Sequence, residues 1–478
     1  MREKAISGII WSTAEKLSTR MVTFVIGIVL ARLLGPEEFG LIGMIMVFTE
    51  ISQIFINGGI KDALIRRKTV ADIEYQTAFW FNLTVGLICY GLLFVAAPWI
   101  ADFYQMPILT SLIRVISIGL LFNAFYMVQE VQVIKALRFK HLMVVGLLSS
   151  VISGAIGIGL ALSDFGVWSL VWRNVILSVA MFMLLSFVTR WQPRIRFSMS
   201  SLKELFSFGS RLMVLGVINT ISNNITYLVI GKKYTAADLG QFTRADTFYK
   251  LPTLTISQTI ERVTYPILAQ YQEDKTRLST VYRRLLNPIF MVTAMVLFTL
   301  SLSAPEMVQI LLGDEWKQSG EFLRILCFAG MFYPLDSLNT NILKVLNNSQ
   351  EVLRIGLLRK ISIAATVVIL LLFGIEAYLY SYIVHRFVAY AMISRLSERL
   401  IGYGIRKQLK DVAPIALVMG IIYTVILLGL KMQIENVWLN LIVTSLLMIG
   451  SSYALLTIFK FRAVGEVNEI VLKKLRKN

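Results

Sequence analysis

The sequence predicts an all-α, polytopic membrane protein, and three features of its composition point to that class. Residues from the set AVILMFWYC make up 56% of the 478 residues, charged residues make up 16%, and the mean hydropathy is +0.69. An average soluble domain is roughly 45–50% apolar and about 25% charged. Water could not solvate the excess apolar surface, whereas a bilayer accepts it. A soluble enzyme, a disordered chain and a secreted disulfide scaffold are therefore excluded.

The charge balance and the rare residue types narrow the class further. The formal net charge is +18, from 47 Lys and Arg against 29 Asp and Glu. In a soluble protein this excess would suggest nucleic acid, but in a membrane protein it indicates basic loops, so we expect no nucleic-acid partner. Cys89 and Cys327 lie in apolar runs, and His141 and His385 are the only histidines. We expect neither a disulfide framework nor a metal site, and no cofactor.

Apolar runs long enough to cross a bilayer predict about fourteen transmembrane helices. A crossing helix needs about 20 predominantly apolar residues. Several runs meet this length without any charge, and the others carry one to three charges. We place the spans at residues 8–33, 39–60, 77–100, 109–131, 142–163, 166–189, 204–230, 241–269, 285–304, 319–343, 353–373, 375–394, 412–430 and 436–459.

The distribution of basic residues predicts the orientation of these spans. With the N-terminus in the cytoplasm, the inner connections hold thirty Lys and Arg and the outer ones hold six. Basic residues accumulate on the cytoplasmic side of membrane proteins. We therefore expect both termini in the cytoplasm, and an amphipathic helix at the lipid surface over residues 460–478.

An internal repeat predicts two lobes of six spans each. Residues 29–40 read VLARLLGPEEFG and residues 229–240 read VIGKKYTAADLG, so that Val29 aligns with Val229 and Gly40 with Gly240. Each segment follows a long, polar-striped span and opens the next one. Parallel repeats with a site at their interface are a known transporter plan. We assign residues 1–200 to an N-lobe, 201–400 to a C-lobe and 401–459 to two further spans.

The first span carries Lys16 and Arg20 on the same helical face as three small or polar residues. Two like charges one turn apart repel each other, and burying them is costly. They are stable facing a wet cavity that receives an anion. Snorkelling to the interface, or pairing with Glu15, is the structural alternative.

The seventh span mirrors the first with a basic residue, Arg211, and a neutral polar stripe. The stripe consists of Asn219, Ser222, Asn223 and Thr226. Neutral donors and acceptors at this spacing can bind sugar hydroxyls. Hydrogen bonds between helices are an equally good explanation of the stripe.

The eighth span carries Asp246, Lys250, Glu261 and Arg262. Asp246 and Lys250 are one turn apart and can neutralise each other. Single charges are scattered over other spans, and for these we expect interfacial or paired structural roles, although ionisable residues within a membrane are functional candidates. These single charges are Glu50, Arg114, Glu130, Arg173, Arg324, Asp336 and Arg386.

Several function classes remain open at this point. The connections are short, and we find no P-loop, GxGxxG, HExxH or CxxC motif. An enzyme such as a membrane glycosyltransferase is therefore disfavoured. A drug or cation antiporter would need a dominant membrane carboxylate, for which Glu15 and Glu50 are candidates. A structural partner of a polysaccharide assembly complex is a further alternative.

Several blocks of the sequence together resemble bacterial polysaccharide exporters. They include KAISGIIWSTAEK, LARLLGPEEFGLIGM, SLKELFSFGSRL, IGKKYTAADLGQFTRAD, RVTYPILAQYQED, LLGDEW and LCFAGMFYPLDSLNTNILK. The chain is similar to the Wzx-like branch of the multidrug/oligosaccharidyl-lipid/polysaccharide flippase superfamily, and most similar to the colanic acid and teichuronic acid exporters. The resemblance extends from about residue 4 to residue 410.

The resemblance implies fourteen spans in two six-helix lobes that form a V around a central cationic cavity. It also implies the cargo, an undecaprenyl-pyrophosphate-linked oligosaccharide that is turned from the cytoplasmic to the periplasmic leaflet of the bacterial inner membrane. In the related lipid II flippases, arginines of spans 1 and 8 line the cavity. The basic residues of those spans here do not match them residue for residue, so their role is a hypothesis.

These expectations assign a role to each candidate residue. The pyrophosphate would bind Lys16, Arg20, Arg211, Lys250 and Arg262, and the glycan would bind Asn219, Ser222, Asn223 and Thr226. Fixed cations suit desolvated phosphates. The other expected partners are membrane lipids, a coupling ion (H⁺ or Na⁺) and proteins of polysaccharide polymerisation.

Overall fold

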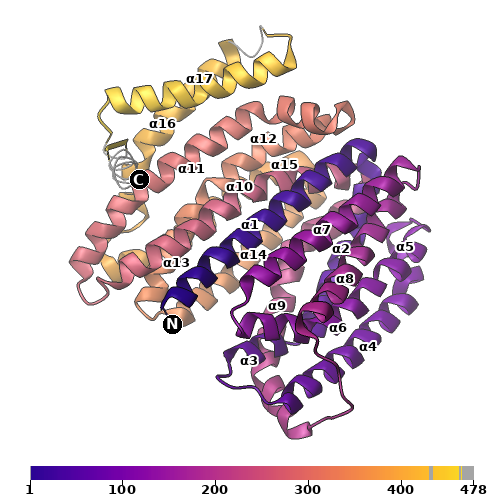
Figure 1. Ribbon diagram of the computed structural model, residues 1–478. Helices are drawn as coiled ribbons and strands as arrows, with labels where there is room; N and C mark the ends of the chain where they lie inside the picture. Colours follow the sequence, from indigo (N-terminus) through magenta and orange to yellow (C-terminus); the bar gives the residue numbers. More distant parts are fainter. Residues whose placement is uncertain (1, 430–433, 462–463, 466–478) are drawn as a thin grey trace. The chain divides into compact units, whose positions relative to one another are not determined.

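The computed structural model describes residues 2–429, 434–461 and 464–465, and the side chains of these residues except those of 2–17, 349 and 353. Every regular element in this part of the chain is helical (Figure 1). The helices are α1 (Arg2–Leu33), α2 (Pro36–Asn57), α3 (Ile60–Arg66), α4 (Asp72–Tyr104), α5 (Leu109–Ile116), α6 (Ile118–Lys135), α7 (Phe139–Leu162), α8 (Val167–Thr189), α9 (Met199–Lys233), α10 (Ala236–Ala269), α11 (Lys275–Leu312), η1 (Asp314–Trp316), α12 (Lys317–Gly330), α13 (Phe332–Val345), α14 (Ser349–Phe373), α15 (Ile375–Ile401), α16 (Ile405–Gly429) and α17 (Val437–Ile458).

The all-helical membrane class is confirmed, and each predicted span coincides with helical structure. Ten stretches of the described chain are long and apolar enough to cross a bilayer, so the chain is a multi-pass membrane protein. The count of fourteen stays a prediction. So does the amphipathic tail, because residues 466–478 lie outside the described part.

Two predicted spans are each divided into two helices. The span at 109–131 contains α5 and α6, and the span at 319–343 contains α12 and α13. The second division has a clear cause. Pro334 lacks the N–H that would bond to the carbonyl of Gly330, the last residue of α12, and its ring crowds that carbonyl. The helix therefore ends there and α13 starts afresh.

The chain forms two compact units, Met1–Gly240 (unit 1) and Gln241–Asn478 (unit 2). In unit 1, α1 packs along α7, α7 packs along α8, and α9 packs against α2, α3 and α4 (Figure 1). The buried side chains of Leu64, Phe79, Val128 and Leu205 join α3, α4, α6 and α9 in one apolar core. The assignment of α9 to a second functional lobe, with a boundary at residue 200, stays a prediction.

The two aligned glycines of the internal repeat make reciprocal contacts inside unit 1. A Cβ added to Gly40 would lie 1.7 Å from the carbonyl oxygen of Ala236, and one added to Gly240 would lie 1.8 Å from that of Pro36. No side chain fits at either distance, so glycine is required at both positions. The start of α2 and the start of α10 therefore touch backbone to backbone at equivalent positions of the repeat.

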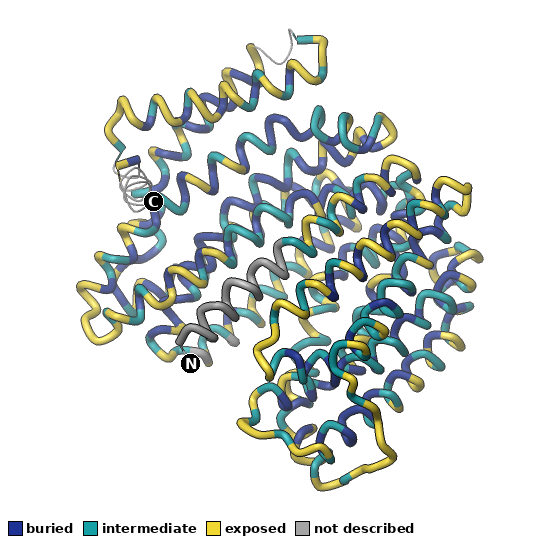
Figure 2. The backbone as a smooth tube through the Cα atoms, in the orientation of Figure 1, coloured by how far each residue is buried: buried dark blue, intermediate teal, exposed yellow. Residues whose placement is uncertain are grey.

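In unit 2, α11 packs against α12, α16 and α17, and α15 packs against α13 and α14. Leu343, Ile355 and Ile393 form a buried cluster between α13, α14 and α15. Figure 2 shows exposed residues recurring along α17. Many of the exposed residues on α16 and α17 are large and apolar, such as Leu417, Ile421 and Leu446. A lipid environment accommodates this apolar surface, which water would not.

Candidate functional site

The polar stripe of α9 contains both exposed and buried side chains. Asn219 and Asn223 are exposed, Ser222 is half-buried and donates to the carbonyl of Ile218 at 2.7 Å, and Thr226 is buried. An exposed amide on a membrane helix is stable where it faces water or a polar ligand rather than hydrocarbon. Of the four predicted glycan residues, Asn219 and Asn223 are thus the exposed ones, and their role in glycan binding stays a prediction.

A hydrogen bond that the sequence did not reveal joins α9 to α2. The amide of Asn224 donates to Oε2 of Glu50 at 2.6 Å and to the carbonyl of Thr220 at 3.0 Å. Asn224 is buried and Glu50 is half-buried. Sequence reasoning treated Glu50 as a single charge, because nothing local indicates a partner on the seventh predicted span.

The predicted pyrophosphate residues lie in both units. Lys16 and Arg20 lie on α1 and Arg211 lies on α9, all in unit 1, whereas Lys250 and Arg262 lie on α10 in unit 2. Arg20, Arg211 and Arg262 have exposed side chains, and the side chain of Lys16 lies outside the described part. The joint role of these five residues in pyrophosphate binding stays a prediction.

Lys250 forms the ion pair that its spacing predicts. Its Nζ lies 2.6 Å from Oδ2 of Asp246, one turn earlier on α10. The Asp246 carboxylate is nearly buried, whereas the Lys250 side chain is 39% exposed. The pair is locally neutral, so Lys250 adds less positive charge to a phosphate site than an unpaired lysine would.

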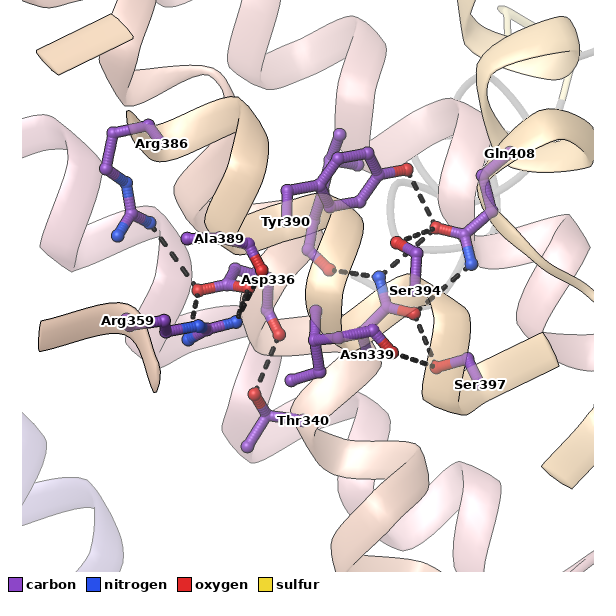
Figure 3. A network of polar contacts seen from close by, with 12 residues as sticks. Asp336, Asn339, Thr340, Arg359, Arg386, Ala389, Tyr390, Ser394, Ser397 and Gln408 are labelled. Atoms are coloured by element: carbon purple, nitrogen blue, oxygen red, sulfur yellow. Dashed lines mark hydrogen bonds and ion pairs between the residues drawn. The ribbon is translucent and has the colours of Figure 1, made fainter. Parts of the chain in front are cut away.

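A largely buried group of charged residues in the described part of unit 2 is centred on Asp336 of α13 (Figure 3). Arg359 of α14 donates through Nη1 and Nη2 to the two carboxylate oxygens, at 2.9 and 2.5 Å. Nη2 of Arg386 on α15 lies 3.5 Å from Oδ2 of the same carboxylate. One carboxylate therefore balances two guanidinium groups. We name these three residues the Asp336 cluster.

The Arg386 guanidinium is also held by an aromatic ring. It lies over the ring of Tyr333, 3.5 Å from the ring centroid, in a cation–π contact. Its Nε–H has no hydrogen-bond partner among the described residues, and only 7% of the residue is exposed. The sequence predicted interfacial or paired structural roles for the single charges Asp336 and Arg386, and in the structure these two residues pair with each other. Sequence reasoning did not single out Arg359.

A second buried network in unit 2 is neutral and surrounds Gln408 (Figure 3). The side-chain oxygen of Gln408 accepts from the hydroxyl of Tyr390 at 2.7 Å and from Ser394 at 3.1 Å. The Gln408 amide donates to Oδ1 of Asn339 at 3.2 Å, and Ser397 donates to the same oxygen at 2.7 Å. These bonds tie α13, α15 and α16 together, which is a structural role for buried polar groups.

Each unit exposes polar side chains of the predicted site, and their role in binding a ligand stays a prediction. Exposed arginines lie on α1, α9 and α10, and exposed amides lie on α9. Within the described residues, no group of three or more His, Cys, Asp or Glu could hold a metal ion. The membrane carboxylates Glu50, Asp246 and Asp336 each contact a donor of the protein.

The chain matches known proteins over most of its length. A family model described as polysaccharide biosynthesis protein matches residues 29–321. The teichuronic acid biosynthesis protein TuaB of Bacillus subtilis (strain 168) is 26% identical over 344 residues, which cover 71% of each chain. The lipopolysaccharide biosynthesis protein WzxC of Escherichia coli (strain K12) is 25% identical over 69% of this chain and 68% of its own.

Solved structures share the fold. The lipid II flippase MurJ, in an inward closed conformation, matches with a TM-score of 0.74 over 94% of this chain and 98% of its own, at 13% identity. An outward-facing multidrug resistance transporter of the MATE family matches with a TM-score of 0.53 over 83% of this chain and 95% of its own, at 16% identity. The fold is therefore that of the MurJ and MATE transporters, and the match to MurJ is the more extensive of these two.

Proposed function

The chain belongs to the polysaccharide biosynthesis protein family, and from this premise we propose that it flips lipid-linked oligosaccharides across a membrane. The cargo is an undecaprenyl-pyrophosphate-linked repeat unit, and the membrane is the bacterial cytoplasmic membrane. The product supplies surface polysaccharide assembly. The protein is a transporter rather than an enzyme.

The observation that carries this proposal is the composition of α9 within a MurJ-like fold. An amphiphilic lipid-linked glycan needs a polar path for its sugars and a cationic site for its phosphates, while its lipid chain stays in the bilayer. The exposed amides of Asn219 and Asn223 provide neutral donors and acceptors, and the exposed Arg211 lies on the same helix. TuaB is named for teichuronic acid biosynthesis and MurJ for flipping lipid II, which agrees with such a cargo.

In the proposed mechanism the pyrophosphate docks on Lys16 and Arg20, with Arg211, Lys250 and Arg262 as further cations. Charge-assisted hydrogen bonds to phosphate are among the strongest available to side chains. The glycan binds along Asn219, Ser222, Asn223 and Thr226. Rocking of two lobes then exposes the site to each side of the membrane in turn.

Two further parts of the proposal concern the energy source for transport and the proteins that receive the cargo. A coupling ion, H⁺ or Na⁺, supplies the driving force, and contacts with polymerase proteins deliver the cargo onward. Both termini lie in the cytoplasm, as the distribution of basic residues favours. A MATE-like drug antiporter is the alternative function, and it would use Glu15 or Glu50 as its membrane carboxylate. The side chain of Glu15 lies outside the described part. Glu50 already accepts a 2.6 Å hydrogen bond from Asn224, which leaves it less open to a cationic drug.

The test is mass spectrometry of lipid-linked glycans in the native host after deletion of the gene. We expect a complete undecaprenyl-pyrophosphate repeat unit to accumulate and the surface polymer to disappear. An unchanged lipid-linked pool together with altered tolerance to cationic drugs would overturn the flippase proposal in favour of the antiporter.

The same strain tests the site through complementation. The K16A/R20A double variant should insert into the membrane but fail to restore the polymer, because the pyrophosphate loses its two fixed cations. A matched control is K275A/R277A at the start of α11, where the Arg277 side chain is 75% exposed and pairs with Asp274. Full export by K16A/R20A would remove these residues from the proposed site, even if the flippase function itself holds.

A further inference from the structure

The connection between α8 and α9 is an irregular segment fixed to the protein along one side. Residues 190–198, which we name the strap, follow Thr189 at the end of α8 and precede Met199 at the start of α9. The N–H of Arg194 donates to Oε1 of Gln76 at 2.6 Å, and the indole of Trp80 donates to the Arg194 carbonyl at 2.9 Å. The strap is therefore held against the first turns of α4.

Two further contacts extend this attachment to both ends of the strap. The N–H of Ser198 donates to Oγ1 of Thr77 at 3.0 Å, and the Trp191 ring packs edge-on against Phe79 with centroids 5.6 Å apart. Thr77 is fully buried and Gln76 is 1% exposed, so the strap is held by groups that belong to the core of unit 1. Its conformation is fixed by the fold rather than by its own sequence.

The exposed part of the strap is an apolar tip between basic residues. The N–H of Arg196 donates to the Arg194 carbonyl at 2.8 Å, which closes a tight turn around Ile195. Ile195 is 94% exposed and Phe197 is 50% exposed, and the side chains of Arg194 and Arg196 are exposed beside them. An isoleucine that is fixed in this position has almost no contact with its own protein.

Arg190 adds a third cation at the start of the strap. It is exposed and has a φ of 53°, the left-handed conformation that glycine adopts more easily than arginine. The N–H of Arg190 also closes the last turn of α8 by bonding to the Ser186 carbonyl at 2.9 Å. The exposed residues of the strap thus include three arginines and two large apolar side chains.

The position of the strap along the chain sets its depth relative to the bilayer. α8 is a stretch long and apolar enough to cross a membrane, and Phe187 in its last turn is 77% exposed. A helix rises about 1.5 Å per residue, so a segment that begins directly after Thr189 lies at the level of the lipid headgroups. There, apolar side chains point toward the acyl boundary while arginines reach phosphates.

We propose that the strap is a binding site for anionic phospholipid headgroups. Arg190, Arg194 and Arg196 contact the phosphates, and Ile195 and Phe197 insert at the acyl boundary. The charge of the strap selects this occupant, because residues 190–198 contain three arginines and no acidic residue. The planar guanidinium fork binds phosphate oxygens in pairs, which a lysine cannot reproduce. The proposal requires only that α8 crosses the membrane, and it does not depend on the transported cargo.

The test places a fluorophore on the tip of the strap. The full-length protein with Cys89 and Cys327 changed to alanine receives I195C, labelled with an environment-sensitive dye, in nanodiscs of phosphatidylcholine with or without phosphatidylglycerol. We expect phosphatidylglycerol to shift the emission to the blue and to increase quenching by nitroxide lipids. The R190Q/R194Q/R196Q variant should lower partitioning of the strap into the anionic surface by roughly a hundredfold, since each arginine contributes about 1 kcal/mol.

Two controls keep the result interpretable. F165C labels the shorter connection between α7 and α8, residues 163–166, where Phe165 is 52% exposed beside Asp164 and no arginine is present. Its dye should respond equally to both lipid mixtures. The R190K/R194K/R196K variant keeps the charge but loses the paired guanidinium contacts. Its response should be weaker than that of the arginine protein and stronger than that of the glutamine variant, which separates loss of charge from loss of fold.

Two outcomes would overturn the proposal. The first is a dye at residue 195 that an aqueous quencher reaches equally in both lipid mixtures. The second is a dye that water reaches in nanodiscs but that is shielded in native membranes, which would assign the surface to a partner protein instead of lipid.

Discussion

At the scale of single residues, the balance of charge around Asp336 is the most consequential feature of unit 2. Two guanidinium groups meet one carboxylate where both Asp336 and Arg386 are 7% exposed. Transferring charges out of water is costly, and the pair is stable only because its geometry and hydrogen bonds offset that cost. The ring of Tyr333 helps to compensate the second cation. Removing the carboxylate would leave both arginines without their shared counter-charge.

We therefore predict that D336N destabilises the protein by about 3–5 kcal/mol, as for breaking a buried ion pair. The measurement is thermal unfolding of the detergent-purified protein, followed by fluorescence-detected size exclusion. The control is E321Q, which breaks the pair of Glu321 with Arg324 on the same helix, where the Glu321 side chain is 49% exposed. E321Q should lower the free energy of unfolding by only about 0.2–1 kcal/mol. Equal losses for the two variants would contradict a special role for the cluster.

At the scale of elements, α9 is held to the first spans near both of its ends. Near its start, a Cβ on Gly209 would lie 2.4 Å from the carbonyl oxygen of Gly58. Just beyond its end, Gly40 and Ala236 approach as closely as the backbone allows. In an alternating-access cycle, the segments on one side of the membrane separate while those on the other side meet. The glycines permit this close approach.

We predict that G40A abolishes most transport although the protein still reaches the membrane. The added methyl group would lie 1.7 Å from the Ala236 carbonyl oxygen, so the start of α2 can no longer close against the start of α10. Recovery of surface polymer in the deletion strain measures the effect. The matched control is G159A on α7, where an added Cβ meets no atom within 4 Å. Normal export by G40A would show that the contact is dispensable for transport.

At the scale of the whole molecule, the hydropathy of the chain predicts that it spans a membrane, and the distribution of charge predicts its orientation. The chain combines 56% apolar residues with a net charge of +18, and the basic residues concentrate in alternate connections. Lys135 and Arg138 lie around the connection between α6 and α7, whereas that between α7 and α8 carries Asp164 and no basic residue. The difference is what the positive-inside rule requires of opposite sides of a membrane.

We predict that R138C is protected from a membrane-impermeant thiol reagent in intact cells, whereas D164C is labelled. Both substitutions are made after Cys89 and Cys327, which are buried and free, have been changed to alanine. Permeabilised cells should label both positions, which controls for local burial. The reverse pattern in intact cells would place the termini outside.

The sequence by itself determined the class of this protein, the place of its helices and its family. Some properties are local, so they can be predicted from one segment of the sequence at a time. They are the length of each apolar run, the positions of glycine and proline, and the charge of each connection. The i,i+4 pair of Asp246 and Lys250 was predictable for the same reason. Among the single charges, the sequence indicated pairing without naming the partners.

Only the tertiary structure decided which distant groups meet. Arg359 pairs with Asp336 from another helix, Asn224 binds Glu50 from a span far away in the chain, and Gly40 touches Ala236. These contacts depend on how helices pack, and no local pattern encodes the rotation of one helix against another. The exposure of Ile195 depends in the same way on the buried side chains of α4 that hold the strap. Helix packing thus decides which polar residues contact each other, because a polar group that is buried without a partner raises the free energy of the folded state.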